Sequence, residues 1–185
     1  MNFRLSLLVL ILLTFYQSLS LAYDCNNYAN FHRDFCFLGD TNSPSNDTIS
    51  ITAVGDIMLG TNYPNKSYLP PNDGKMLLDS VKQFLEKGDI TFGNFEGVIG
   101  VGGKPKSCNN PKFCYTFRMP ESYISNIKNS GIDLLSIANN HANDFGIGGR
   151  QSTAKILDSA GLFFAGSIDK PYTIFKLNGI KYGFL

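Results

Sequence analysis

Residues 132–144 read Ile-Asp-Leu-Leu-Ser-Ile-Ala-Asn-Asn-His-Ala-Asn-Asp, and this stretch decides how the chain is interpreted. Its first half, Ile132 to Ala138, is almost continuously apolar, which is typical of a strand buried on both faces of a parallel sheet. Its second half changes at once to amide, imidazole and carboxylate side chains. A buried strand that ends in such a polar run favours an α/β sheet with functional groups at the strand's carboxyl end.

The chain around this stretch alternates strand and helix signals. Short apolar runs bounded by glycine or polar residues predict strands at 49–54, 89–93, 132–138 and 162–165. Apolar residues at helical spacing predict helices at 73–87, 120–131 and 150–160. The dipeptide Asn178-Gly179 between two apolar runs predicts a β-hairpin.

This alternation predicts parallel strands joined by right-handed crossovers, and so an α/β fold with helices on both faces of the sheet. In the helix predicted at 73–87, Leu77, Val81, Phe84 and Leu85 fall on one face. We expect that face to be buried against the sheet.

Side chains that bind metals or transfer protons follow three of the predicted strands. Asp56 follows the first strand, Asn94 and Glu96 follow the second, and Asn140 and His141 follow the third. The carboxyl ends of parallel strands meet at one edge of a sheet, so we expect these side chains to lie close together. Oxygen and imidazole ligands together suit a divalent metal such as Mn, Fe or Zn.

Each of these motifs also has a purely structural interpretation. Gly55-Asp56 and Gly93-Asn94 could be turns in which the polar side chain binds its own backbone. Asn139-Asn140 could cap the start of a helix, and His141 could be a partly buried imidazole. The coincidence of the motifs at one end of neighbouring strands favours a functional site over these separate explanations.

With these motifs, residues 49–185 resemble the bacterial capsule synthesis proteins of the CapA/PgsA type, which are associated with poly-γ-glutamate capsules. The resemblance is carried by Gly55-Asp-Ile-Met-Leu-Gly60, Gly93-Asn-Phe-Glu96 and Ala138-Asn-Asn-His-Ala-Asn-Asp-Phe-Gly146. That family is similar to the calcineurin-like metallophosphoesterases. The resemblance therefore implies a layered metallophosphoesterase-like sheet, a divalent metal and an anionic polymer or phosphoester substrate.

Position by position, the resemblance implies that Asp56, Asn94, Glu96 and Asn140 bind the metal. It implies a catalytic role for His141, which would stabilise the transition state or protonate the leaving group. The sequence departs from the phosphoesterase pattern in two places: Met58 stands where a histidine is expected, and Asn94 stands where an aspartate bridges the metals.

Two functional interpretations follow from the resemblance and its departures. The first is an exported, metal-dependent hydrolase or transferase in capsule or anionic-polymer biosynthesis, whose metal would activate water and neutralise substrate charge. The second is a non-catalytic subunit of polymer assembly or export that keeps the fold. An export role would imply a membrane-bound biosynthesis complex as partner.

The N-terminal residues 1–22 have the features of a secretory signal peptide: Arg4, an apolar run from Leu5 to Tyr16, and small residues at the −3 and −1 positions, Ser20 and Ala22. Residues 23–48 form a polar lead-in. An even number of cysteines in an exported chain favours disulfides. The spacing suggests the pairs Cys25–Cys36 and Cys108–Cys114, which would pin the lead-in and the loop at 97–114.

Charge and composition exclude other classes. The net charge is +1 and there is no basic run, so nothing favours a nucleic-acid partner. The glycine-rich segment 97–103 leads into a loop, whereas a dinucleotide-binding fingerprint must enter a helix. The last residues form an apolar strand and the chain has only two histidines, His32 and His141. We therefore expect this to be the N-terminal half of a longer protein that carries the rest of the metal site.

The signal peptide gives the first testable prediction. We expect export to remove residues 1–22, because the small side chains before the bond after Ala22 suit signal peptidase. N-terminal sequencing of the secreted protein should begin at Tyr23. An intact Met1 on the mature protein would contradict the prediction.

Overall fold

The structure is a computed structural model that describes residues 48–107 and 115–185. The predicted signal peptide and nearly all of the predicted lead-in lie outside the described residues. The same is true of all four cysteines, namely Cys25, Cys36, Cys108 and Cys114. The export signal and the disulfide pairing therefore stay predictions.

The strands of the described chain are β1 (Ile51–Ile57), β2 (Ile90–Phe95), β3 (Val98–Ile99), β4 (Arg118–Met119), β5 (Leu134–Ser136), β6 (Phe163–Ala165), β7 (Thr173–Leu177) and β8 (Ile180–Phe184). The α-helices are α2 (Asp79–Leu85), α3 (Ile124–Asn129) and α4 (Gly146–Ala160). Two short 3-10 helices are η2 (Pro71–Gly74) and η4 (Glu121–Tyr123).

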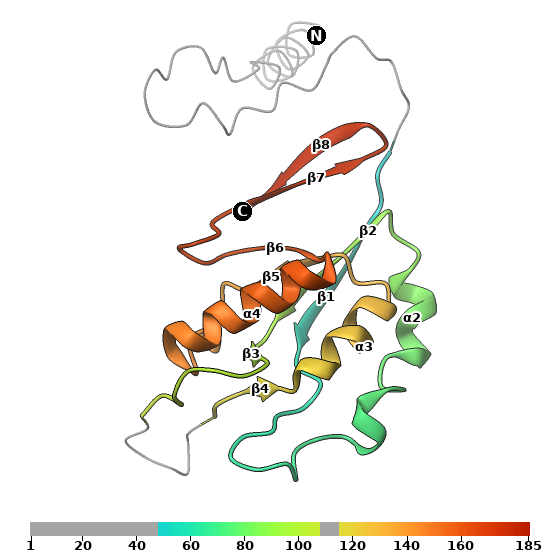
Figure 1. Cartoon of the computed structure of the whole chain (residues 1–185). Helices are drawn as coiled ribbons and strands as arrows, with labels where there is room; N and C mark the ends of the chain where they lie inside the picture. Colours follow the sequence, from blue (N-terminus) through green and yellow to red (C-terminus); the bar gives the residue numbers. More distant parts are fainter. Residues whose placement is uncertain (1–47, 108–114) are drawn as a thin grey trace, which may run out of the picture. The chain divides into compact units, whose positions relative to one another are not determined.

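The main sheet has the strand order β1-β2-β5-β6, and every neighbouring pair is parallel (Figure 1). The predicted α/β class with a parallel sheet is confirmed. Strands β7 and β8 form an antiparallel hairpin, in which Asn178 and Gly179 have φ values of 49° and 85°. Two positive φ angles in a two-residue loop suit the right-handed twist of the strands, and this predicted hairpin is also confirmed.

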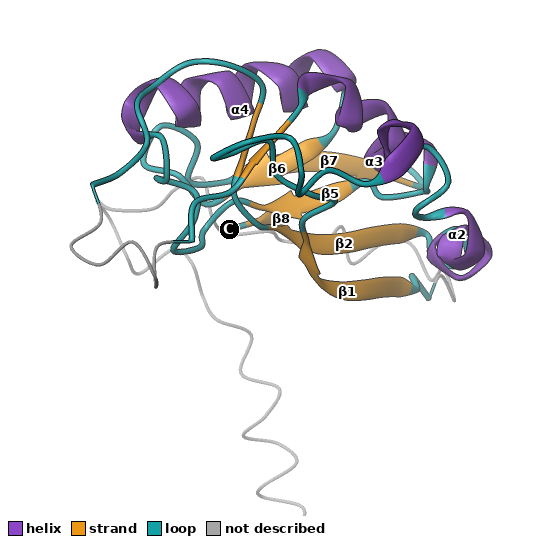
Figure 2. Cartoon of the chain, turned by 90° about the horizontal axis from the view of Figure 1, so that it is seen from below, coloured by secondary structure: helices purple, strands orange, loops and turns teal. Residues whose placement is uncertain are grey.

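The helices of the described chain cover one face of the main sheet rather than both (Figure 2). Leu85 of α2, Ile127 of α3 and Leu157 of α4 belong to a single buried cluster. The strand order explains this difference from the prediction. Each step from β1 to β6 moves in the same direction across the sheet, so right-handed crossovers deliver every helix to the same face. Helices on the second face would need a reversal of strand order, which these strands do not make.

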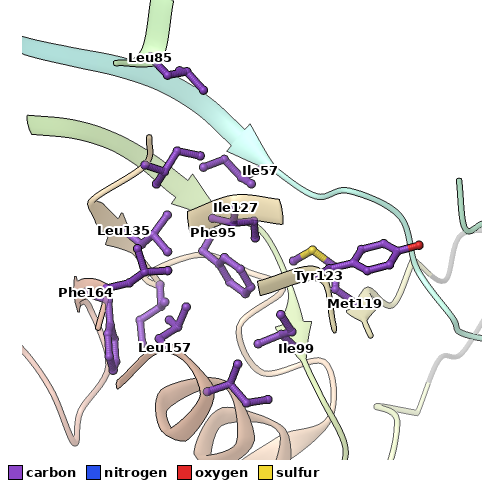
Figure 3. Close-up of a cluster of buried hydrophobic side chains, with 14 residues drawn as sticks. Ile57, Leu85, Phe95, Ile99, Met119, Tyr123, Ile127, Leu135, Leu157 and Phe164 are labelled. Atoms are coloured by element: carbon purple, nitrogen blue, oxygen red, sulfur yellow. The ribbon is translucent and has the colours of Figure 1, made fainter. Parts of the chain in front are cut away.

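The core between sheet and helices is built on side chains at the centre of the sheet (Figure 3). Phe95, Leu135 and Phe164 come from three adjacent strands and are fully buried against the helices. Burial of each such side chain contributes about 1.5–3 kcal/mol of hydrophobic stabilisation. This layer fixes the strands, and thereby the polar groups at their carboxyl ends.

The hairpin supplies the cover for the other face of the sheet. Phe175 of β7 packs with Ile90 of β2 and Leu134 of β5 in a second buried cluster. The strong apolar character of the strand predicted at 132–138 is thus explained, because Leu134 and Leu135 are buried on opposite faces.

Strand β1 contains an irregularity that decides which of its side chains face the core. Ala53 pairs with Phe92, but the next recorded pair is Asp56 with Asn94, so β1 has one residue more than β2 in this interval. Such a β-bulge reverses the alternation of side chains beyond it. As a result Ile57 is buried, whereas Ile51 at the start of the strand is 63% exposed.

The helix predicted at 73–87 is shorter than expected. Asn72 and Asp73 have φ values of 54° and 53° inside η2, so no regular helix starts there, and α2 begins only at Asp79. Of its predicted buried face only Leu85 is buried; the exposed members are Leu77, Val81 and Phe84. None of the described helices is both long and apolar enough to cross a membrane.

Hydrogen bonds at the start of the sheet give a stability prediction. The Ser50 hydroxyl and backbone N–H donate to Asp89 Oδ2 at 2.6 and 2.7 Å. These bonds, the hydroxyl bond first, hold the pKa of Asp89 below its ordinary value of 3.8. A lowered carboxyl pKa stabilises the fold above the unfolded-state pKa, and this stabilisation is lost as the pH falls through the folded-state pKa.

We therefore expect Asp89→Asn to lower the melting temperature at about pH 7 and to have a smaller effect at about pH 2, because the wild-type carboxylate takes up its proton as the pH falls through its folded-state pKa. Thermal unfolding followed by circular dichroism at both pH values measures the difference. The exposed Asp169→Asn is the matched control, for which we expect the same melting temperature as wild type. A destabilisation by Asp89→Asn of equal size at both pH values would contradict the ionic origin of the effect.

Candidate functional site

The parallel register brings the polar ends of β1, β2 and β5 together. Asp56 of β1 pairs with Asn94 of β2, and Asn94 pairs with Ser136 of β5. Neighbouring strands lie about 4.8 Å apart, so side chains at and just beyond these positions meet at one edge of the sheet. Glu96 and the loop after β5 reach the same edge, as the sequence predicts.

Asn94 is the centre of a hydrogen-bonded cluster at this edge. Its Nδ2 donates to Asp56 Oδ1 at 2.7 Å and to Glu96 Oε2 at 2.8 Å. Its Oδ1 accepts a hydrogen bond of 3.0 Å from Asn139 Nδ2. One neutral amide therefore bridges two carboxylates, which relieves their mutual repulsion and ties both to the loop after β5.

Asn139 connects the cluster to His141. Its Nδ2 also donates to the backbone oxygen of Phe95 at 2.8 Å, and its Oδ1 accepts from the backbone N–H of His141 at 3.1 Å. Asn140, the neighbouring amide expected as a metal ligand, is exposed and lines a cavity beside the cluster. The geometry thus gives Asn139 the central position that the sequence suggested for Asn140.

The imidazole of His141 is held by a buried carboxylate. Asp144 has a fully buried side chain, and its Oδ2 lies 2.8 Å from His141 Nδ1. The same oxygen accepts a hydrogen bond of 2.7 Å from the backbone N–H of Phe117, and its Oδ1 pairs with Lys106 Nζ at 2.5 Å. A buried carboxylate is stable only with such charge-assisted partners.

The ring of His141 is further fixed by stacking. The Phe117 ring lies 4.3 Å from it between centroids, at an interplanar angle of 29°. Because a carboxylate can only accept, the hydrogen shared with Asp144 sits on His141 Nδ1. Nε2 is then the nitrogen that faces the cluster, 3.7 Å from Glu96 Oε1.

Asp144 is the functional residue that sequence reasoning missed. It lies within the quoted motif, three residues after His141, and its N–H donates to the His141 carbonyl at 3.0 Å. A spacing of three residues places two side chains on one side of a helical turn. That spacing, between an imidazole and a carboxylate, was the signal that could have revealed the pair.

The donor set fits a divalent cation of the hard or borderline kind. In a neutral ring, the Nε2 lone pair of His141 and the carboxylate of Glu96 are two acceptors that face each other at 3.7 Å. They need a positive charge near them, which a proton on Nε2 or a cation held by Glu96 would supply. No group of three His, Cys, Asp or Glu side chains among the described residues could hold a metal, so amide oxygens would have to contribute.

Met58 takes no part in the cluster. Its Sδ accepts a hydrogen bond of 3.2 Å from the backbone N–H of Gly60. Its side chain lines a mainly apolar pocket with Leu59, Leu69 and Leu77. The thioether therefore faces an apolar environment at the position where phosphoesterases are expected to have a histidine.

The fold is a parallel sheet whose neighbouring strand ends carry Asp56, Asn94, Glu96 and an Asn-His pair. This combination is that of an α/β protein with a metallophosphoesterase-like fold. Residues 50–185 match the family described as bacterial capsule synthesis protein. The chain belongs to this family, as the motifs in its sequence indicate.

Several curated proteins are similar to parts of the chain. It is 28% identical to the capsule biosynthesis protein CapA of Bacillus anthracis, over 66% of this chain and 29% of that protein. It is 29% identical to the PGA biosynthesis protein CapA of Bacillus subtilis, over 64% and 31% respectively. The uncharacterized protein y4sH of Sinorhizobium fredii is 29% identical over 69% and 26%. The chain thus spans about a quarter to a third of the length of the curated relatives it matches.

The bridging amide gives a prediction about metal affinity. Asn94→Asp would place a third carboxylate between Asp56 and Glu96, where a cation can relieve the repulsion. We expect the variant to melt at a lower temperature than wild type without metal and to gain more stability from Mn²⁺, by about 1.4 kcal/mol for each tenfold gain in affinity at saturating metal.

Thermal unfolding with and without Mn²⁺ measures this effect, and isothermal titration gives the affinity directly. Asn129→Asp makes the same chemical change at an exposed site on α3 and is the control. If both variants respond to Mn²⁺ in the same way, the cluster is not a cation site.

Proposed function

We propose that this chain takes part in the synthesis of an anionic capsule polymer of the poly-γ-glutamate type, as a metal-dependent hydrolase or transferase. The observation that supports this most directly is the convergence of Asp56, Glu96 and His141 from three strand ends on one hydrogen-bonded cluster. Membership of the capsule synthesis family supplies the biological process.

The residues that would hold a divalent cation of the Mn, Fe or Zn class are Asp56, Asn94 and Glu96, and the exposed amide of Asn140 would have to turn toward them from the wall of the neighbouring cavity. Asn94 would have to turn its amide oxygen, in place of Nδ2, toward the ion. A cation bound there would neutralise negative charge on an anionic substrate. With a neutral amide at the bridging position, we expect weaker metal binding than with a carboxylate there.

The proposed role of His141 is to hold a proton at Nε2 and donate it to the leaving group. Asp144 would keep the ring oriented through Nδ1 and would stabilise its positive charge. Phe117, stacked on the ring, would limit access of water to it. General acid catalysis of this kind contributes about 10²–10⁴-fold to a rate.

The proposed substrate is the anionic polymer itself or a phosphoester used in its assembly. The predicted signal peptide supports a periplasmic, cell-surface or extracellular location. In that location the chain would work with a membrane-bound biosynthesis complex, because a role in polymer export implies a membrane partner.

A non-catalytic assembly or export subunit is the second candidate. The amide of Asn94 lies between the two carboxylates, and the thioether of Met58 faces an apolar pocket. Both features favour a protein that keeps the fold and the arrangement of side chains at the strand ends but binds a metal too weakly for catalysis. The two candidates differ in whether the cluster residues are required for polymer production.

The enzyme proposal predicts the effect of removing the acid. We expect His141→Ala to lower polymer yield by about 10²-fold or more in the organism that encodes the chain, because the proton donor is lost. Capsule yield is measured as polymer released per cell, with the amount of the protein checked by immunoblot. Lys155→Ala, at an exposed position on α4, is the control and should give normal yield.

The double variant Asp56→Ala, Glu96→Gln separates the two candidates. An enzyme that needs the cluster would lose polymer production in this variant as it does with His141→Ala. Normal yield in both variants, at normal protein levels, would exclude catalysis at this site and favour the assembly subunit.

A further inference from the structure

A large cavity opens directly beside the cluster. Its volume is about 990 Å³, which is at the upper end of the range for small-molecule sites. It begins at Gly97 and the amides of Asn139 and Asn140, and it extends along α4 to the turn that follows β6. Asn139 belongs both to the cavity wall and to the hydrogen-bonded cluster, so the two adjoin at this residue.

Arg150, on the first turns of α4, supplies a cation to the cavity wall. Its NH1 donates to the neutral amide oxygen of Asn143 at 2.8 Å, and its buried Nε has no hydrogen-bond partner. None of the carboxylates in the described ranges pairs with it. A partly buried guanidinium without a counterion is costly, so this position suits an anion supplied by a ligand.

The other charged groups of the cavity do not replace that anion. Lys170 is paired with Asp158 at 2.7 Å and lies over the Phe164 ring at 3.9 Å. Asp169, on the exposed turn, makes the wall less favourable for a ligand group with two negative charges. The charge balance favours a singly charged group, such as a carboxylate, over a phosphate monoester.

We propose that this cavity binds a carboxylate-bearing segment of the polymer, with one carboxylate on Arg150 and a neighbouring unit at the Glu96–His141 cluster. This inference rests on the proposed function, since the polymer is the substrate considered there. It adds the position that selects an acidic chain, and Arg150 as the residue that recognises it.

Binding of a labelled γ-linked oligoglutamate to the purified full chain tests the proposal. Fluorescence anisotropy compares this probe with an oligomer of the same length in which the carboxylates are amidated, and with inorganic polyphosphate. We expect wild type to bind the oligoglutamate more tightly than both other probes. Arg150→Gln should weaken oligoglutamate binding by about tenfold or more, as expected for loss of a charge-assisted pair.

Lys155→Gln is the matched control, because it removes a cation from an exposed position on the same helix and outside the cavity. Normal binding by this variant with weak binding by Arg150→Gln supports the proposal. Equal losses in both variants would indicate non-specific attraction and overturn it. Unchanged binding in Arg150→Gln, no binding of oligoglutamate by wild type, or tighter binding of polyphosphate would also overturn it.

A measurement on wild type covers the case in which Arg150→Gln does not fold. The guanidinium Nε–H resonance of Arg150 should shift on titration with oligoglutamate and stay in place with the amidated oligomer. No shift with either probe would contradict the proposed contact.

Different measurements distinguish a failure of this proposal from a failure of the proposed function. Glu96→Gln and His141→Ala test the chemistry through polymer yield, whereas the anisotropy experiment reads binding alone. Binding that depends on Arg150, together with normal yield in the cluster variants, would keep the cavity as a polymer site and reject catalysis. The reverse result would keep the cluster and reject the cavity.

Discussion

The register of β1 against β2 is the constraint on which the site depends. Side chains alternate between the two faces of a sheet, so a shift of one residue turns every later side chain to the opposite face. The extra residue in β1 makes this shift between Ala53 and Asp56. Beyond it Ile57 enters the core beside Phe95, and Asp56 comes into register with Asn94. Regular pairing would direct Asp56 to the helix-covered face, away from Asn94 and Glu96.

The buried carboxylate of Asp144 fixes the loops next to the strand ends, as the register fixes the strands. Through its two oxygens it joins His141, the backbone before β4 at Phe117, and Lys106 from the loop after β3. These segments are distant in sequence, and an unpaired charge at this depth would be strongly destabilising. The same contacts that satisfy Asp144 therefore give His141 a fixed position and a defined tautomer.

The chemistry of the cluster is shaped by one neutral residue. The amide of Asn94 donates to both carboxylates, so it holds them together without the full positive charge that a cation would bring. Under the proposed function, this arrangement would let the cluster hold a metal weakly or serve in binding alone. In the neighbouring cavity, the guanidinium of Arg150 likewise has a neutral hydrogen-bond partner, Asn143. Its positive charge is therefore not neutralised by that partner, which is the basis of the proposed carboxylate site.

Several features of this protein were determined by the sequence alone. The alternation of strands and helices, the doubly buried strand near Leu134 and the hairpin at Asn178-Gly179 follow from local periodicity and turn chemistry. The same is true of the grouping of Asp56, Glu96 and His141, since strand ends in a parallel sheet meet at one edge.

Only the tertiary structure decided the rest, because those features depend on contacts between distant segments. The order of the strands placed the helices on one face, and the bulge set the orientation of Asp56. The helix predicted at 73–87 is regular only from Asp79 to Leu85, and its apolar residues Leu77 and Val81 are exposed. The three-residue spacing of His141 and Asp144 is visible in the sequence, but the other partners of the Asp144 carboxylate, Phe117 and Lys106, lie far away along the chain, and local pattern does not encode them.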